Sequence, residues 1–122
     1  MVMSFARPAN FDVTTCGLAD GSVVMRVTGE VDCCASIRLR TDLLAACHVA
    51  HAGSLRLDLG GVTFIDCAGL GALCDGATAA QVRGVPLHLE SVSPSVAQII
   101  ELAGPVPELL MPDATWTSRR SA

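Results

Sequence analysis

The sequence predicts an α/β protein in which helices pack on a mixed β-sheet of four to five strands. Segments with an apolar residue at every second position, typical of strands, alternate with longer segments whose apolar residues recur every three or four positions, typical of helices. The resulting order is strand, strand, helix, strand, helix, strand, helix, which indicates the α/β class. The chain has 122 residues, 51% of them apolar, which is enough for one domain with its own core.

The first two strands are expected to form a hairpin. Residues 11–16 and 23–27 carry strand patterns, and the pair Asp20-Gly21 between them is a turn signal. Gly29 would then permit a sharp exit from the second strand, because glycine tolerates backbone conformations that other residues avoid.

A helix is predicted over residues 34–50, with Asp32 as its amino-terminal cap and Gly53 closing it. Arg38 and Asp42 lie four residues apart on this helix and are expected to pair. The apolar stripe follows the i, i+4, i+7, i+11 pattern of a helix packed on a core and consists of Leu39, Leu43, Ala46 and Ala50.

The next strand is predicted at residues 55–59, where three leucines alternate with polar residues and the pair Gly60-Gly61 ends the strand. Asp66 is positioned to cap a second long helix, over residues 67–83, which Gly84 ends. One side of that helix is apolar and carries Leu70, Leu73, Cys74 and Ala77.

A strand at residues 85–90, with Pro86 near its start, and a helix introduced by Ser93-Pro94 complete the regular elements. Residues 106–111 are a candidate for a last edge strand. We therefore expect a single domain over residues 1–122, with a core at about 10–111 and tails at 1–9 and 112–122.

The start of the second long helix is unusually rich in glycine. Gly69 and Gly71 each cost about 1 kcal/mol relative to alanine in a helix interior, so something offsets that loss. Two explanations stay open and are compatible. The glycines let the helix pack closely on the sheet, or they let a partner or an anion approach the free N–H groups of the helix start.

The segment from Asp58-Leu59 through Val62 to Gly71 resembles the signature of STAS domains, in particular the bacterial anti-sigma factor antagonists. Residues Gly29 to Asp32 resemble a second motif of that family, and Ser93-Pro94 has a family counterpart too. The resemblance implies a STAS fold and a partner, an anti-sigma factor that is a GHKL-type serine kinase. It implies partner contacts at Glu30, Asp32, Asp66, Cys67, Ala68, Gly69 and Gly71.

One departure from the family pattern concerns the phosphoacceptor. The family places a serine where this chain has Cys67, followed here by Ala68, so neither position carries a hydroxyl. The resemblance then implies an antagonist that is not phosphorylated at the usual site. Two alternatives remain: a structural STAS subunit of a lipid-transport ABC complex or signalling scaffold, and a redox-responsive antagonist that uses Cys67.

Composition argues against several other functions. The net charge is −4 and aromatic residues make up 3% of the chain, so direct nucleic-acid binding is not expected. With no signal peptide and no membrane-span pattern, we expect a cytoplasmic protein without membrane insertion, a monomer or weak homodimer. No catalytic motif is present, so we expect neither an enzyme nor a cofactor.

Six cysteines allow a disulfide or a zinc site, but reduced structural thiols are the favoured interpretation because several cysteines fall on apolar positions. No Cys-x-x-Cys spacing is present, and His48 and His51 are expected to be surface residues rather than metal ligands.

Overall fold

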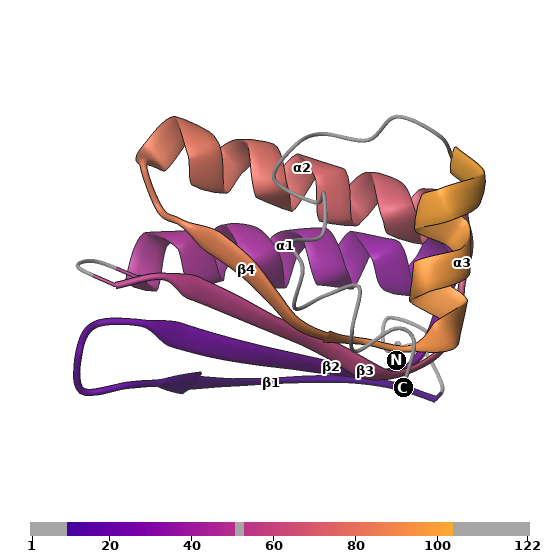
Figure 1. Cartoon of the computed structure of the whole chain (residues 1–122), viewed down its shortest axis with the longest axis horizontal. Coiled ribbons are helices and arrows are strands. Elements are labelled where there is room, and N and C mark those ends of the chain that lie inside the picture. Colours follow the sequence, from indigo (N-terminus) through magenta and orange to yellow (C-terminus); the bar gives the residue numbers. More distant parts are fainter. Residues whose placement is uncertain (1–9, 51–52, 104–122) are drawn as a thin grey trace, which may run out of the picture.

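A computed structural model describes residues 10–50 and 53–103, which form a four-stranded sheet and three helices (Figure 1). The predicted α/β class and the mixed sheet are confirmed. The elements in chain order are β1 (Phe11–Gly17), β2 (Val23–Val31), α1 (Cys33–Val49), β3 (Leu55–Ile65), α2 (Cys67–Arg83), β4 (Leu87–Val92) and α3 (Pro94–Ala103).

The strands lie in their sequence order across the sheet. β1 and β2 are antiparallel, as the predicted hairpin requires, whereas β2, β3 and β4 are parallel. Each parallel connection is made by a helix of 17 residues, because a tight turn cannot join parallel strands. In Figure 1, α1 and α2 lie together over one face of the sheet, and α3 lies at one end of it.

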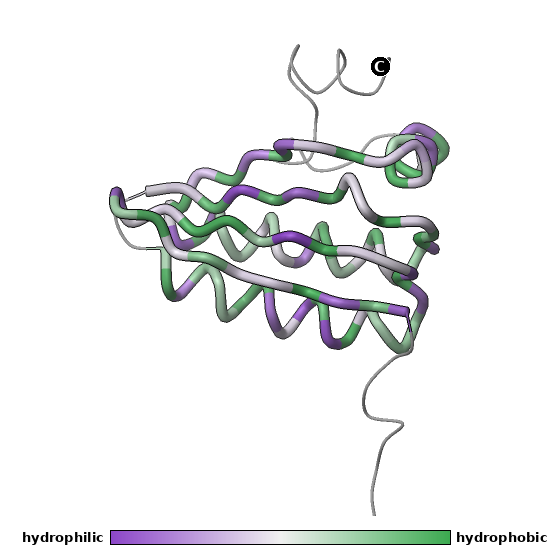
Figure 2. Tube along the Cα trace, turned by 90° about the horizontal axis from the view of Figure 1, so that it is seen from below, coloured by the Kyte–Doolittle hydropathy of each residue, from purple (hydrophilic) through white to green (hydrophobic). Residues whose placement is uncertain are grey.

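The core fills the space between the sheet and the two long helices. Met25 and Val27 of β2 and Leu55 and Leu57 of β3 are fully buried on the face that α1 and α2 cover. The side chains between them point to the opposite face, so hydrophilic and hydrophobic residues alternate along the strands (Figure 2).

The opposite face of the sheet is polar and carries two cross-strand ion pairs. Arg26 Nε lies 3.1 Å from Asp58 Oδ2, and Arg56 lies 3.5 Å from Glu90. Exposed pairs of this kind contribute little to stability, but they help to set the register of neighbouring strands.

The double glycine does not end β3, and that prediction is wrong. β3 continues to Ile65 because its pairing with β2 resumes beyond an irregularity: Asp58 pairs with Arg26, and Gly61 pairs with Thr28. A Cβ at Gly61 would lie 2.7 Å from the Thr28 Cγ2 atom. The glycines therefore accommodate a bulge within one long strand.

Gly29 likewise lies inside a strand and does not form an exit from it. Its φ of +95° is in the left-handed region, and a Cβ there would collide with the carbonyl oxygen of Asn10. That carbonyl accepts a hydrogen bond of 2.8 Å from the Glu30 N–H. β2 therefore continues through Gly29 and ends at Val31.

Other boundaries shift by a few residues. α1 begins at Cys33 and its carboxyl-terminal cap is Ala50, so Gly53 does not close it. β4 starts at Leu87, after Pro86, because proline cannot donate a ladder hydrogen bond. The helix at 67–83 and its end at Gly84 are confirmed. The expected strand at 106–111, the tails at 1–9 and 112–122, and His51 lie outside the described residues.

α1 and α2 pack closely because α2 presents a glycine to α1. A Cβ at Gly76 would lie 2.7 Å from Leu43 Cδ1 and 3.1 Å from Leu43 Cβ. An ion pair of 2.8 Å between Arg40 and Asp75 flanks this contact.

We expect Gly76→Ala to lower the free energy of unfolding by about 1–2 kcal/mol, because crowding against Leu43 outweighs the better helix propensity of alanine. Gly71→Ala, in the same helix with nothing within 4 Å of the added Cβ, should instead raise it by up to about 1 kcal/mol. Urea denaturation of the two variants measures both. Equal stabilisation by both would contradict the close packing.

Candidate functional site

Two helix starts lie next to each other at the carboxyl end of the sheet. β2 and β3 are parallel neighbours that finish in register, with Val31 opposite Ile65. Each strand is followed by one aspartate and then by a helix. The N–H of Asp66 donates a 3.2 Å hydrogen bond to the Val31 carbonyl, which joins the two connections. In Figure 1 this is the end of the sheet where α3 also lies.

Both aspartates cap their helices, as predicted. Asp32 Oδ1 accepts a hydrogen bond of 2.9 Å from the N–H of Ala35, and Asp66 Oδ1 accepts one of 2.9 Å from the N–H of Gly69. Both side chains remain partly exposed. Their carboxylates satisfy free donors and complement the positive ends of the helix dipoles.

The residues around these caps differ in their exposure to solvent. Glu30 and Cys67 are exposed, and Ala68 is half-buried. Cys67 is the first residue of α2, so its thiol occupies the exposed helix start where the family resemblance places a hydroxyl. Glu30, Asp32, Asp66 and Cys67 therefore share one end of the sheet.

The two glycines of the α2 start have different surroundings. Gly69 is buried, and a Cβ there would lie 2.7 Å from Ile65 Cγ1 and 2.9 Å from the Val31 carbonyl oxygen. Close packing on the sheet, one of the two open explanations, thus accounts for Gly69. Nothing lies within 4 Å of a Cβ built on Gly71. Of the two glycines, Gly71 has free space beside it.

Phe64 belongs to this surface and was missed by the sequence analysis. It pairs with Glu30 in the sheet register, yet 48% of its side chain is exposed. Beside it runs a shallow groove between the end of β3 and α3, lined by Phe64, Ile65, Ser95, Gln98, Ile99 and Leu102. Ser95 Oγ donates a 3.0 Å hydrogen bond to the Thr63 carbonyl and holds α3 against the strand. An aromatic residue two positions before the Asp66 cap was the available signal.

The cysteines of this chain are all free thiols, and most are exposed. Only Cys47 is buried and Cys74 half-buried; burial raises the pKa of both thiols. The expectation of reduced thiols at apolar positions fits Cys47 and Cys74. The other four, Cys16, Cys33, Cys34 and Cys67, face solvent.

Two further features concern other possible sites. Within residues 10–50 and 53–103, no group of three His, Cys, Asp or Glu side chains is arranged to hold a metal ion. His48 is exposed and lies against Arg83, at the far end of α1. In the same described part, no helix has the length and apolar character to cross a membrane.

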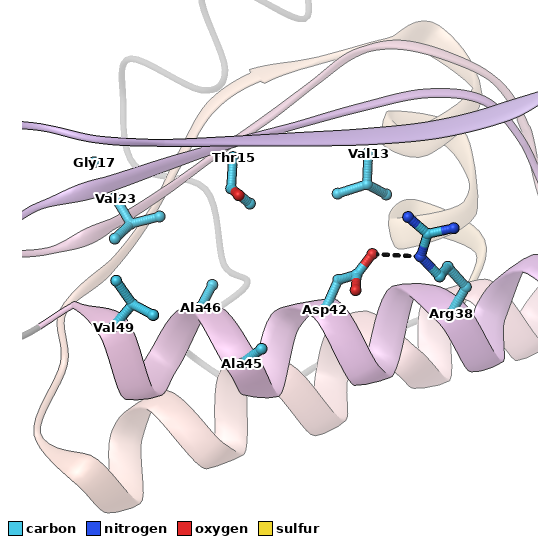
Figure 3. Close-up of a pocket in the computed structure, with 9 residues that line it drawn as sticks. All are labelled: Val13, Thr15, Gly17, Val23, Arg38, Asp42, Ala45, Ala46 and Val49. Atoms are coloured by element: carbon cyan, nitrogen blue, oxygen red, sulfur yellow. Dashed lines mark hydrogen bonds and ion pairs between the residues drawn. The ribbon is translucent and has the colours of Figure 1, made fainter.

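A cavity of about 260 Å³ lies between the hairpin and α1, away from the helix starts (Figure 3). Its lining is mostly short and apolar, and the predicted Arg38–Asp42 ion pair, 2.8 Å long, stands at one side. None of the residues proposed for partner contact lines it.

Comparison with known families identifies the fold. A family model described as "Mlab, STAS domain" matches residues 15–105, well over half of the chain. The chain therefore belongs to the STAS domain family.

A Mycobacterium tuberculosis protein named as a candidate anti-anti-sigma factor is 40% identical over 60 residues. That match covers 49% of this chain and 40% of the relative, so it spans less than half of either protein.

Solved structures of anti-sigma factor antagonists share the fold. One from Mycobacterium paratuberculosis has a TM-score of 0.67 at 22% identity, over 80% of this chain and 81% of its own. SpoIIAA in its unphosphorylated form has a TM-score of 0.60 at 21% identity, over 85% and 90% of the two chains. The phosphorylated form from Bacillus has a TM-score of 0.61 at 18% identity, over 76% and 84%.

We expect Asp66→Ala to lower the free energy of unfolding by about 1 kcal/mol, because the N–H of Gly69 loses its acceptor. Asp66→Asn keeps an acceptor oxygen in place and should stay close to the natural protein. Thermal or urea unfolding compares the two variants. If asparagine destabilises as much as alanine, the charge and not the cap is what stabilises this helix start.

Proposed function

We propose that this STAS domain is an anti-sigma factor antagonist that regulates transcription indirectly, by binding a partner anti-sigma factor rather than by catalysis. The observation that carries the proposal is the pair of aspartate-capped helix starts at one end of the sheet, with Glu30 and Cys67 exposed beside them. The family membership and the names of the similar proteins support the same function.

The proposed contact surface consists of Glu30, Asp32, Asp66, Cys67 and Ala68, with Gly71 next to it and Gly69 packed beneath. Three carboxylates make this surface acidic, so it fits a partner surface that carries basic side chains. Phe64 adds a half-exposed aromatic ring, the kind of residue that often dominates interface energetics. We propose a GHKL-type serine kinase as the partner and the cytoplasm as the location.

The chemistry of position 67 implies that this antagonist stays in its unmodified form. A phosphate on a helix start adds about −1.5 to −2 charges and disturbs a docking surface. A serine kinase needs a hydroxyl acceptor, and neither Cys67 nor Ala68 provides one. Binding to the anti-sigma factor would then not be reversed by phosphorylation at this site.

Incubation with the cognate anti-sigma kinase and ATP should leave the intact mass of the natural protein unchanged. The Cys67→Ser variant, which restores a hydroxyl at the exposed first residue of α2, should gain about 80 Da in the same assay. Intact-mass spectrometry reads both reactions. A gain of that size on the natural chain, blocked by Cys67→Ala, would refute the proposal.

Phe64→Ala should weaken binding to the anti-sigma factor by at least about tenfold, because an exposed aromatic at an interface centre commonly supplies more than 1 kcal/mol. Val82→Ala is the matched control: Val82 is also an exposed apolar residue, 80% accessible, but lies near the far end of α2. Calorimetric titration measures both affinities, and unfolding curves check that each variant is folded. Equal affinities for the two would place the interface elsewhere.

A second candidate is a structural STAS subunit of a lipid-transport ABC complex or of a signalling scaffold. The missing hydroxyl at positions 67 and 68 favours it, because such a role needs no phosphoacceptor. The genes beside the coding sequence distinguish the two. A GHKL-type kinase or sigma-factor gene supports the antagonist, whereas a permease and ATPase pair supports the structural subunit.

A redox-responsive antagonist that uses Cys67 is the third candidate. The exposure of this thiol at the start of α2 favours it, because a helix dipole stabilises a thiolate. The negative charge of Asp66 next to it acts in the opposite direction. Labelling of Cys67 at pH 7 no faster than that of a free cysteine would argue against this function.

A further inference from the structure

Two consecutive cysteines, Cys33 and Cys34, open α1, and none of the functions above uses them. Both thiols are exposed and free. They follow directly on the Asp32 cap, and β2 ends just before them at Val31. They therefore lie at the same end of the sheet as Glu30 and Asp66.

The two thiols also act on each other. The pKa of Cys34 is raised above its ordinary value, first by the charge of Cys33 beside it, then by a hydrogen bond with the Cys33 side chain, and then by Asp32. Both residues are consecutive in the first turn of α1, and both are exposed.

We propose that Cys33 and Cys34 form a modification site for a two-electron oxidant such as hydrogen peroxide, which joins them in a vicinal disulfide. The Cys33 thiolate attacks one peroxide oxygen, the O–O bond breaks, and hydroxide leaves, so that Cys33 becomes a neutral sulfenic acid. Cys34 then attacks that sulfur, the S–OH bond breaks, and water leaves with the proton of Cys34. In total, two thiols are oxidised and one peroxide is reduced to two waters.

The first step prepares the second. The main cause that holds the proton on Cys34 is the negative charge of Cys33, and a sulfenic acid at Cys33 is neutral. Cys34 then loses its proton more readily, and the thiolate is the form that attacks.

Closing the disulfide must distort the first turn of α1. Successive Cβ atoms of a helix diverge by about 100° around the axis, which does not suit the short ring that a vicinal disulfide forms. Three hydrogen bonds depend on this turn: Ala35 N–H to Asp32 Oδ1 at 2.9 Å, Ser36 N–H to the Asp32 carbonyl at 2.8 Å, and Ser36 Oγ to the Cys33 carbonyl at 2.8 Å. Oxidation thus reshapes the surface that contains Glu30 and Asp32.

The consequence for binding rests on the proposed antagonist function, whereas the chemical step does not. If that function holds, the oxidised protein should bind its anti-sigma factor at least about tenfold more weakly than the reduced protein, because the Asp32 side of the contact surface is displaced. Dithiothreitol should restore the affinity.

The full chain offers a direct test of the chemistry. Trypsin cleaves after Arg26 and Arg38, and the peptide 27–38 contains Cys33 and Cys34 and no other cysteine. After treatment with hydrogen peroxide and alkylation, this peptide should appear about 2 Da lighter than its reduced form and without an alkyl group. Dialkylation of the peptide, a disulfide to any other cysteine, or a stable sulfinic acid would overturn the proposal.

Matched variants separate this pair from the remaining thiols. Cys34→Ser should leave a sulfenic acid at Cys33 that dimedone traps, and the loss of about 2 Da should disappear. Cys67→Ser keeps the pair and should still show that loss. If the disulfide forms but binding does not change, the effect on the surface is refuted while the modification site stands. A reduced protein that does not bind counts against the antagonist function alone.

Discussion

The parallel pairing of β2 with β3 is the constraint on which the rest of the structure depends. Because the two strands finish in register at Val31 and Ile65, the helices that follow must begin next to each other. The backbone hydrogen bond from the Asp66 N–H to the Val31 carbonyl holds the segment before α2 against the segment before α1. Two capped helix starts, each with a positive dipole end, therefore lie at one edge of the domain.

The second requirement is close packing of α2 on the sheet and on α1, and glycine residues of α2 allow it. Gly69 brings α2 against the end of β2, and Gly76 brings α2 against α1. A side chain at either position would separate the layers and move the helix starts away from the sheet. Gly69 and Gly76 are unfavourable for helix propensity, but they allow the close packing that positions the proposed contact surface. Gly71 differs from them, because nothing lies within 4 Å of a Cβ built on it.

The exposed side chains at this edge carry carboxylates, thiols and one aromatic ring. Glu30 and Phe64 pair across the strands, while Cys33, Cys34 and Cys67 occupy the first turns of the two helices. The family membership accounts for the fold that brings them together. In this chain no hydroxyl stands at positions 67 and 68.

Local signals in the sequence determined the order of elements, both aspartate caps, the Asp20-Gly21 hairpin and the end of α2 at Gly84, because each depends on a few neighbouring residues. Only the tertiary structure decided that β3 continues through Gly60-Gly61, that Gly29 lies within β2, and that four cysteines face solvent. These outcomes depend on partners distant in sequence, such as Thr28 opposite Gly61 and Asn10 against Gly29. The exposure of Phe64 is of the same kind, since it depends on where α3 packs.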